Sequence, residues 1–253
     1  MPEPILTVSG LTKTFKLHGR EDVLAVKDVS FALYPGETLG IIGESGSGKT
    51  TLVNLITGLL PATSGTVTLG DIEVTACRGK TLRSVWKNLQ VVFQTPTESF
   101  DPRRTLGDGI CESMRNNGLS KADAKARAKE LLALCGLPEE FVNRYPHEVS
   151  GGQCQRAAIA RALAIEPKLL ICDEATSALD VTIQAEIVAL LRQLRQKLDM
   201  SILFICHDIA LVQQFCDRVV VMYHGEIVEE GEPNAVITAP KNDYTQDLID
   251  SIL

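Results

Sequence analysis

The chain has 253 residues, of which 45% are hydrophobic and 23% charged, and its formal net charge is −7. This composition is typical of a globular protein with one large domain. The acidic charge argues against a general nucleic-acid binder, which needs clustered lysines and arginines. No run of 18 apolar residues occurs, and the N-terminal residues lack the features of a signal peptide, so we expect a cytosolic protein.

Seven cysteines are present, an odd number, and no two of them form a Cys-x-x-Cys pair. This spacing disfavours a zinc site or a disulfide framework. Cys172 and Cys206 each end a short apolar run. We therefore expect the cysteines to be small buried hydrophobic residues.

The first ninety residues favour strands and turns. Residues 23–33 alternate apolar and polar side chains, which is the period of a half-buried strand. Residues 38–42 predict a short apolar strand, and a glycine-rich loop and a helix over about 49–59 follow it. Further strands are predicted at 65–69 and 89–93.

The rest of the chain alternates between helical and strand patterns. Residues 106 to about 163 are helical in pattern, with Ser120 as a helix cap. Apolar strands at 169–172, 202–206 and 219–222 then alternate with helices at 181–198 and 209–215. Such alternation implies an α/β fold with a largely parallel sheet, here with a helical insertion and a short helical tail after Gly231.

The strongest local signal is the run Gly43-Glu44-Ser45-Gly46-Ser47-Gly48-Lys49-Thr50. It matches G-x-x-x-x-G-K-[ST] and lies between a predicted strand and a predicted helix, which disfavours a chance glycine-rich turn. Glycines let backbone N–H groups face phosphate oxygens, and the helix N-terminus adds partial positive charge. We expect Lys49 to reach the β- and γ-phosphates of ATP and Thr50 to bind Mg²⁺.

Two carboxylates, Asp173 and Glu174, end the predicted strand at 169–172. Open α/β sheets bind ligands at this end of their strands. Acidic pairs are common at strand ends, so this pair alone does not indicate a functional site. Together with the 43–50 loop, it does. We then expect Asp173 to hold Mg²⁺ and Glu174 to act as general base on the attacking water.

A third signal, Ser150-Gly151-Gly152-Gln153, opens another predicted helix, over residues 155–164. A serine and paired glycines at a helix N-terminus form a second phosphate-binding end. This run resembles the Leu-Ser-Gly-Gly-Gln sequence that defines the ATP-binding subunits of ABC transporters. Val149 replaces the leucine, which we interpret as a packing variant because both residues are apolar.

Other residues match the family pattern in order, and the resemblance covers essentially the whole chain. Gln94 matches the glutamine that senses Mg²⁺ and the membrane domain, and His207 matches the switch histidine at the γ-phosphate. Asp180 ends Ser177-Ala178-Leu179-Asp180, which matches the loop that crosses to the other nucleotide-binding subunit. Phe15 matches the aromatic that stacks on adenine, although the long loop after it leaves a core role open.

The resemblance therefore implies the following site. The catalytic residues are Glu174, His207, Lys49 and Gln94, and the Mg²⁺ ligands are Thr50, Gln94 and Asp173. The nucleotide-binding residues are Phe15, Gly43, Glu44, Ser45, Gly46, Ser47, Gly48, Lys49, Thr50, Thr51, Gln94, Ser150, Gly151, Gly152, Gln153, Asp180 and His207.

The resemblance also implies a fold and partners. The fold is a P-loop NTPase (RecA-like) core with a mostly parallel sheet, an antiparallel β subdomain and an inserted α-helical subdomain. We assign 1–94 and 166–230 to the core, 95–165 to the helical subdomain and 231–253 to a helical tail. The partners are a second nucleotide-binding subunit, identical or different, two transmembrane permease subunits and an extracytoplasmic substrate-binding protein. The chain would work at the cytoplasmic face of the membrane, without nucleic acid.

Within the family, the chain is most similar to subunits of peptide and nickel importers. Pro102-Arg103-x-Thr105 follows Gln94-x-Pro96 as in their extended glutamine loop, and Asp243-Tyr244-Thr245 resembles their C-terminal Tyr-Thr motif. The longer cysteine-containing tail of many peptide-importer subunits is missing, which keeps nickel-type members open. The substrate is not readable from the sequence.

Two other functions compete with that of a transport ATPase. One is a soluble ABC-type ATPase that acts on DNA or ribosomes, which the single compact domain and the acidic charge disfavour. The other is a regulatory nucleotide-binding module without turnover, which the presence of both Glu174 and His207 disfavours.

Overall fold

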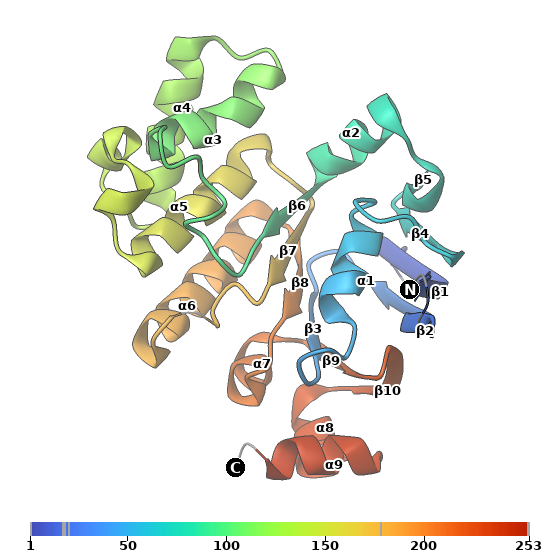
Figure 1. The fold of residues 1–253 in the computed structure, drawn as a ribbon. Coiled ribbons are helices and arrows are strands. Elements are labelled where there is room, and N and C mark those ends of the chain that lie inside the picture. Colours follow the sequence, from blue (N-terminus) through green and yellow to red (C-terminus); the bar gives the residue numbers. More distant parts are fainter. Residues whose placement is uncertain (1, 17–18, 20, 178, 252–253) are drawn as a thin grey trace.

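The computed structural model describes residues 2–16, 19, 21–177 and 179–251. Its centre is a six-stranded sheet in the order β10-β9-β3-β8-β7-β6 (Figure 1). Strands β9, β3, β8, β7 and β6 are parallel to one another, and only β10 runs antiparallel to its neighbour. The predicted α/β fold with a mostly parallel sheet is confirmed. The strands are β3 (Thr38–Ile42), β6 (Leu89–Val92), β7 (Leu169–Asp173), β8 (Ser201–Ile205), β9 (Arg218–Tyr223) and β10 (Glu226–Gly231).

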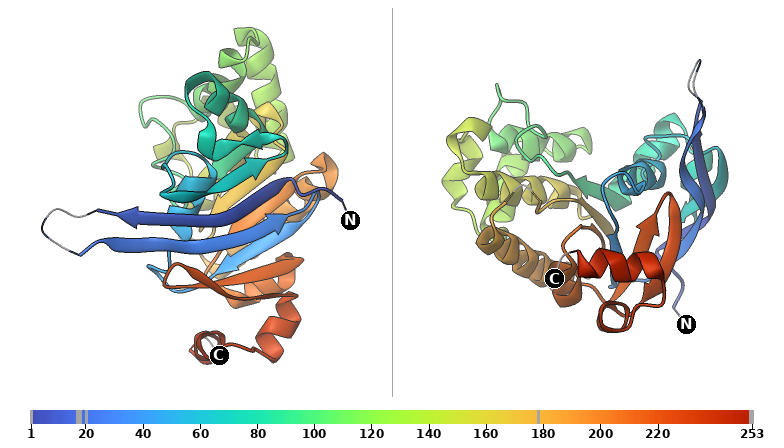
Figure 2. Two further views of the ribbon diagram at one scale, coloured as in Figure 1. Left: turned by 90° about the vertical axis from the view of Figure 1, so that its right-hand side faces the viewer. Right: turned by 60° about the horizontal axis from the view of Figure 1, so that its bottom comes forward.

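A second sheet contains four antiparallel strands in the order β2-β1-β4-β5. These strands are β1 (Leu6–Phe15), β2 (Val23–Leu33), β4 (Ser64–Leu69) and β5 (Ile72–Glu73). Strands β1 and β2 form a long hairpin that Figure 2 (left) shows from the side. Leu6 pairs with Leu33 on one side and with Leu69 on the other, so apolar side chains of three strands share one buried face.

Nine α-helices surround the sheets in the described part of the chain. Figure 1 shows α3 and α4 at the upper left and α8 and α9 at the bottom. The helices are α1 (Lys49–Ile56), α2 (Gly79–Asn88), α3 (Leu106–Asn116), α4 (Lys121–Leu134), α5 (Gly151–Ala162), α6 (Val181–Leu198), α7 (Ile209–Phe215), α8 (Pro233–Thr238) and α9 (Asp243–Asp250). Short 3₁₀ turns cover Val74–Ala76, Glu139–Asn143, Pro146–Glu148 and Leu163–Ile165.

Three helices differ from the sequence-based prediction. Helix α5 begins at Gly151 rather than at residue 155, because Ser150 is its N-cap. Helix α1 ends at Ile56 rather than near residue 59, because Gly58 turns the chain with a φ of 70°. Helix α2 was not predicted, since it is short and mostly polar and Val85 is its one buried residue. The indole N–H of Trp86 ties α2 to the end of α1 by donating to the Thr57 carbonyl oxygen at 2.9 Å.

The six-stranded sheet separates two hydrophobic clusters. Leu170 and Cys172 of β7 face the cluster that holds α3 to α6, whereas Leu169 and Ile171 face the cluster that holds α1 and the antiparallel sheet. Both faces of the sheet are thus covered, which is typical of parallel strands. All seven cysteines are buried and free, as expected. No helix within the described ranges is both long and apolar enough to span a membrane.

Candidate functional site

A cavity of about 360 Å³ lies over the 43–50 loop, which joins β3 to α1. Loop and α1 residues form one wall, and β2 and the turn between β9 and β10 form another. Glu174 contributes a carboxylate to the cavity lining. The lining residues from the loop and α1 are Ser45, Gly46, Gly48, Lys49, Thr50 and Thr51, and the others are Val23, Leu24, Ala25, Glu174, His224 and Gly225.

Glycines give the loop its shape. Gly43, Gly46 and Gly48 have φ values of 150°, 85° and 104°, which side chains rarely allow. A Cβ on Gly43 would lie 2.2 Å from the Met222 carbonyl oxygen, and one on Gly48 would lie 2.4 Å from that of Ala25. The loop can therefore pass between these strands only with glycine at both positions.

Lys49 is the buried cation of the loop, with only 5% of its surface exposed. Its Nζ donates to the carbonyl oxygens of Gly43 and Glu44, both at 2.7 Å, and to Ser47 Oγ at 3.3 Å. Burial lowers the pKa of Lys49, while the charges of Glu174 and Asp173 act in the opposite direction. An ammonium group held this way is placed to exchange carbonyl partners for anionic oxygens.

Asp173, the last residue of β7, is buried and lacks a full set of partners. Burial and the neighbouring Glu174 charge raise the pKa of Asp173 to about 6, against the opposing effect of Lys49. Its Oδ1 atom is buried and has no hydrogen-bond partner among the described residues. A buried carboxylate oxygen without a donor fits a hard cation such as Mg²⁺. Asp173 itself lies outside the cavity lining, whereas Thr50 and its neighbour Glu174 belong to it.

The helix starts of α5 and α6 form a separate cluster. Ser150 caps α5 by accepting from Gln153 N–H at 3.3 Å, and Gln153 Oε1 accepts from Ser150 N–H at 2.9 Å. Asp180 caps α6 by accepting from Ile183 N–H at 3.0 Å. A Cβ on Gly152 would lie only 2.7 Å from Ile183 Cγ2, so the two helix starts are in contact. Ala178, between them in sequence, lies outside the described residues.

The structure does not bring all the predicted site residues together. Within the described ranges, neither the α5 start nor the α6 start lines the cavity. Gln94 after β6 and His207 after β8 are exposed and lie outside its lining as well. Phe15 is partly exposed, belongs to neither hydrophobic cluster, and pairs with Val23, which does line the cavity.

The 43–50 loop also contacts two distant segments, the β9–β10 turn and the C-terminal Tyr-Thr motif, that the sequence did not link to it. Gly225 N–H donates to the Ser47 carbonyl oxygen at 3.0 Å, and His224 precedes it in the β9–β10 turn. Tyr244 of α9 accepts a hydrogen bond from Glu44 N–H at 3.0 Å. These contacts join segments about 180 to 200 residues apart, so no local sequence pattern predicts them.

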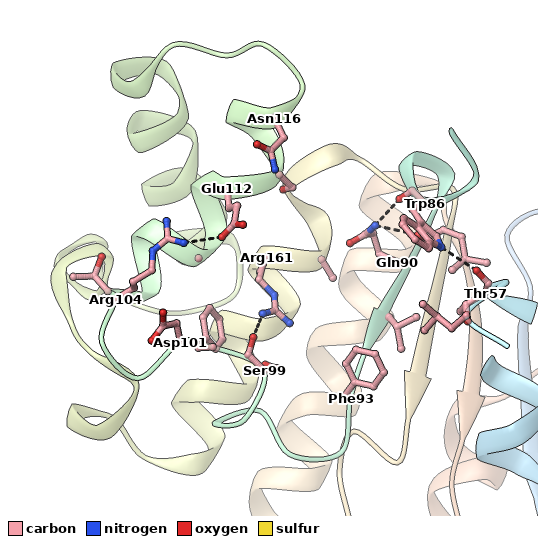
Figure 3. A pocket seen from close by; sticks show the side chains of 18 residues that line it. Thr57, Trp86, Gln90, Phe93, Ser99, Asp101, Arg104, Glu112, Asn116 and Arg161 are labelled. Carbon is pink, nitrogen blue, oxygen red and sulfur yellow. Dashed lines mark hydrogen bonds and ion pairs between the residues drawn. The ribbon is translucent and has the colours of Figure 1, made fainter. Parts of the chain in front are cut away.

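A second cavity, of about 520 Å³, lies between the end of β6 and helices α3 and α5 (Figure 3). Arg161 lies inside it, donates to the Ser99 carbonyl oxygen and places its guanidinium 4.6 Å from the Phe100 ring centroid. Leu59 and Phe93 line the rim with exposed fractions of 55% and 40%. The cavity thus combines exposed apolar side chains with a partly buried cation.

A family model described as ABC transporter matches residues 26–177, more than half of the chain. The chain belongs to the ABC transporter family. It is 46% identical over 230 residues to the oligopeptide transport ATP-binding protein OppF of Salmonella typhimurium, which covers 90% of this chain and 69% of that protein. It is 43% identical over 257 residues to the glutathione import ATP-binding protein GsiA of Salmonella paratyphi A, covering 99% of this chain and 41% of that protein.

Solved structures of ABC cassettes have the same fold. The ATP-binding cassette MJ0796, a dimer in a post-hydrolysis state bound to ADP and Pi, has a TM-score of 0.82 and 31% identity, covering 90% of this chain and 98% of that one. The cbiO1 protein of Clostridium perfringens, part of the ABC transporter complex cbiONQ, has a TM-score of 0.83 and 30% identity, covering 93% and 91%. ABC cassettes hydrolyse ATP to drive transport, so the predicted ATPase activity is confirmed. The roles of individual residues stay predictions.

Proposed function

We propose that the chain is the ATP-hydrolysing subunit of a peptide importer and that ATP binds in the cavity over the 43–50 loop. The observation that carries this proposal is the convergence of Lys49, Thr50 and Glu174 on one cavity. Import of peptides rests on the similarity to OppF and GsiA, whose names specify oligopeptide transport and glutathione import. Nickel import is the competing substrate class from the sequence pattern.

The loop binds the phosphates in this proposal. Lys49 exchanges its hydrogen bonds to the Gly43 and Glu44 carbonyl oxygens for bonds to β- and γ-phosphate oxygens. Backbone N–H groups of the loop and the α1 N-terminus, including Ser45, Gly46, Ser47, Gly48 and Thr51, add donors and partial positive charge. Val23 and Leu24 provide an apolar wall for the adenine, with Phe15 at its edge.

The hydrolytic residues stand at the carboxyl ends of β7 and β8. Thr50, Asp173 and Gln94 would hold Mg²⁺, which would neutralise charge on the phosphates when bound. Glu174 takes a proton from the attacking water as general base. His207, which follows β8, contacts the γ-phosphate and orients that water.

A second nucleotide-binding subunit completes the site. The α5 start, with Ser150 to Gln153, and Asp180 lie away from this chain's own cavity, so they are free to meet the nucleotide of a partner. The dimer of the MJ0796 cassette supports this arrangement. The same surface would serve a homodimer in the isolated protein and a heterodimer in the transporter.

The second cavity is the proposed contact with a permease subunit in the membrane (Figure 3). It adjoins the segment that carries Gln94, and its rim residues Leu59 and Phe93 are apolar and exposed. A short apolar helix from the cytoplasmic side of a permease subunit fits this rim. Two permease subunits and an extracytoplasmic binding protein would then complete an importer at the cytoplasmic face of the membrane.

Nucleotide titration tests the site. Lys49→Ala should weaken ATP binding roughly ten- to a hundredfold, since it removes charge-assisted hydrogen bonds, and should leave adenosine binding unchanged. Lys80→Ala, on the exposed face of α2, is the matched control and should bind ATP like the wild type. Unchanged ATP affinity in Lys49→Ala would overturn the assignment of the loop.

Uptake in the native host tests the substrate class. Deletion of the gene should abolish uptake of a radiolabelled tripeptide, and the wild-type gene but not Lys49→Ala should restore it. Loss of ⁶³Ni²⁺ uptake with normal tripeptide uptake would instead assign the chain to a nickel importer.

A further inference from the structure

The C-terminal helix touches the nucleotide-binding loop. The Tyr244 hydroxyl, in the first turn of α9, accepts a hydrogen bond from the backbone N–H of Glu44 at 3.0 Å. Glu44 is the second residue of the 43–50 loop, 200 positions away in sequence. We infer that Tyr244 is a positioning residue for this loop and raises its affinity for nucleotide phosphates. The inference rests on the proposed nucleotide site.

Tyr244 is itself held firmly. Its ring stacks on Tyr223 at the end of β9, with ring centroids 3.9 Å apart and an interplanar angle of 24°. Asn242 caps α9 by accepting from Tyr244 N–H at 2.9 Å. The hydroxyl position is therefore fixed from the sheet side and from the helix side.

The turn before α9 is anchored to β10, against which α9 lies (Figure 2, right). The carboxylate of Glu229, a buried residue of β10, accepts from Lys241 N–H at 3.0 Å and from Asn242 N–H at 3.2 Å. Charge-assisted bonds to two successive backbone groups fix where the helix starts. Helix α9 is thus held in a defined position next to the 43–50 loop.

Tyr244 supports a part of the loop that loses its other side-chain contact when Lys49 turns to phosphate. Gly225 N–H holds the far end of the loop through the Ser47 carbonyl oxygen at 3.0 Å, and the Lys49 ammonium holds the carbonyl oxygens of Gly43 and Glu44. Lys49 must give up these two carbonyl bonds when it turns to phosphate. The Tyr244 hydroxyl then remains as the side-chain contact that keeps the Glu44 peptide in place.

Binding and tail docking are consequently linked. If α9 docking raises nucleotide affinity, bound nucleotide must strengthen α9 docking by the same factor. The aromatic contact of Tyr223 with His224, at 4.1 Å between centroids, extends this link to the cavity wall.

Titration of the full-length chain with Mg²⁺–ADP tests the inference without interference from hydrolysis. Tyr244→Phe removes one oxygen and keeps the stacked ring, and it should weaken ADP binding about two- to tenfold, which is the range for one neutral hydrogen bond. Tyr223→Phe is the matched control, because the Tyr223 hydroxyl makes no hydrogen bond among the described residues. This variant should bind ADP within about twofold of wild type.

Amide exchange provides a readout that a merely structural role would not move. In the nucleotide-free protein, Tyr244→Phe should speed exchange at Glu44 N–H, and Mg²⁺–ADP should slow exchange at the start of α9 in the wild type more than in the variant. Wild-type ADP affinity in Tyr244→Phe, or an equal loss in Tyr223→Phe, would overturn the inference. Lys49→Ala separates the two proposals, because wild-type ADP affinity in that variant would refute the nucleotide site itself.

Discussion

Asp173 and Glu174 are consecutive residues in opposite environments. Asp173 ends β7 as a buried carboxylate whose Oδ1 has no partner among the described residues, whereas Glu174 lines the cavity. The chain turns between them because Glu174 adopts a left-handed backbone with a φ of 49°. Such a conformation costs a residue with a side chain about 1–3 kcal/mol and is common at functional sites. One carboxylate is thereby buried and the other lines the cavity, which agrees with their proposed roles as cation ligand and general base.

Glu174→Gln should separate ATP binding from hydrolysis. Glutamine keeps the shape of the side chain but cannot take a proton, so steady-state phosphate release should fall roughly 10²- to 10⁴-fold while ATP still binds. Glu73→Gln, in the exposed strand β5, is the matched control and should hydrolyse ATP normally. Phosphate release within about threefold of wild type in Glu174→Gln would show that another residue is the base.

The buried Asp173 should make the metal-free protein less stable as the pH rises. Its pKa of about 6 in the folded state exceeds the ordinary value of 3.8, so the folded state binds more protons than the unfolded state between these pH values. The free energy of unfolding therefore falls across that window. The full effect is on the order of 3 kcal/mol.

Asp173→Asn removes this cost. In chelator and without nucleotide, the variant should have a higher unfolding temperature than the wild type at about pH 8, and the difference should shrink toward about pH 5. Mg²⁺–ADP should reverse the order, because only the wild type has the carboxylate. Asp71→Asn, at an exposed turn, should show neither effect. A lower unfolding temperature for Asp173→Asn at about pH 8 in chelator would contradict the argument.

Two inactive variants should complement each other if the ATP site is shared between subunits. Lys49→Ala damages the loop and Ser150→Arg damages the α5 start, so each homodimer lacks an intact site but a mixed dimer keeps one. Mixing them should restore part of the phosphate release, and wild-type specific activity should rise with protein concentration. Constant specific activity over about a hundredfold dilution, in a monomer confirmed by light scattering, would rule out the shared site.

The contact between α5 and α6 predicts a difference between two neighbouring glycines. A Cβ on Gly152 would lie 2.7 Å from the branched Ile183 Cγ2, whereas one on Gly151 would lie 3.6 Å from Leu179 Cδ2, an ordinary contact. Gly152→Ala should therefore lower the free energy of unfolding by about 1–3 kcal/mol, as measured by urea denaturation. Gly151→Ala should change it little, and equal losses in both variants would argue against this packing.

The parts of the fold that were predicted correctly from the sequence are those with strong signals in adjacent residues. Helices α6 and α7 have the predicted bounds because Asp180 and Asp208 cap them and their apolar period is strong. The 43–50 loop and the Asp173–Glu174 pair were likewise found from runs of adjacent residues. Helix α2 was missed because it buries little, and the contacts of Gly225 and Tyr244 were missed because they join distant segments.

The helices between β6 and β7 have no hydrophobic core of their own. Leu106, Leu131 and Ile159 belong to the same buried cluster as Leu170 of β7 and Phe204 of β8. Removing or loosening these helices would expose one face of the sheet whose strand ends carry Asp173 and Glu174. The chain should accordingly unfold in a single cooperative transition, and a substitution deep in α4 would reduce ATP binding at the same temperature at which helical structure is lost.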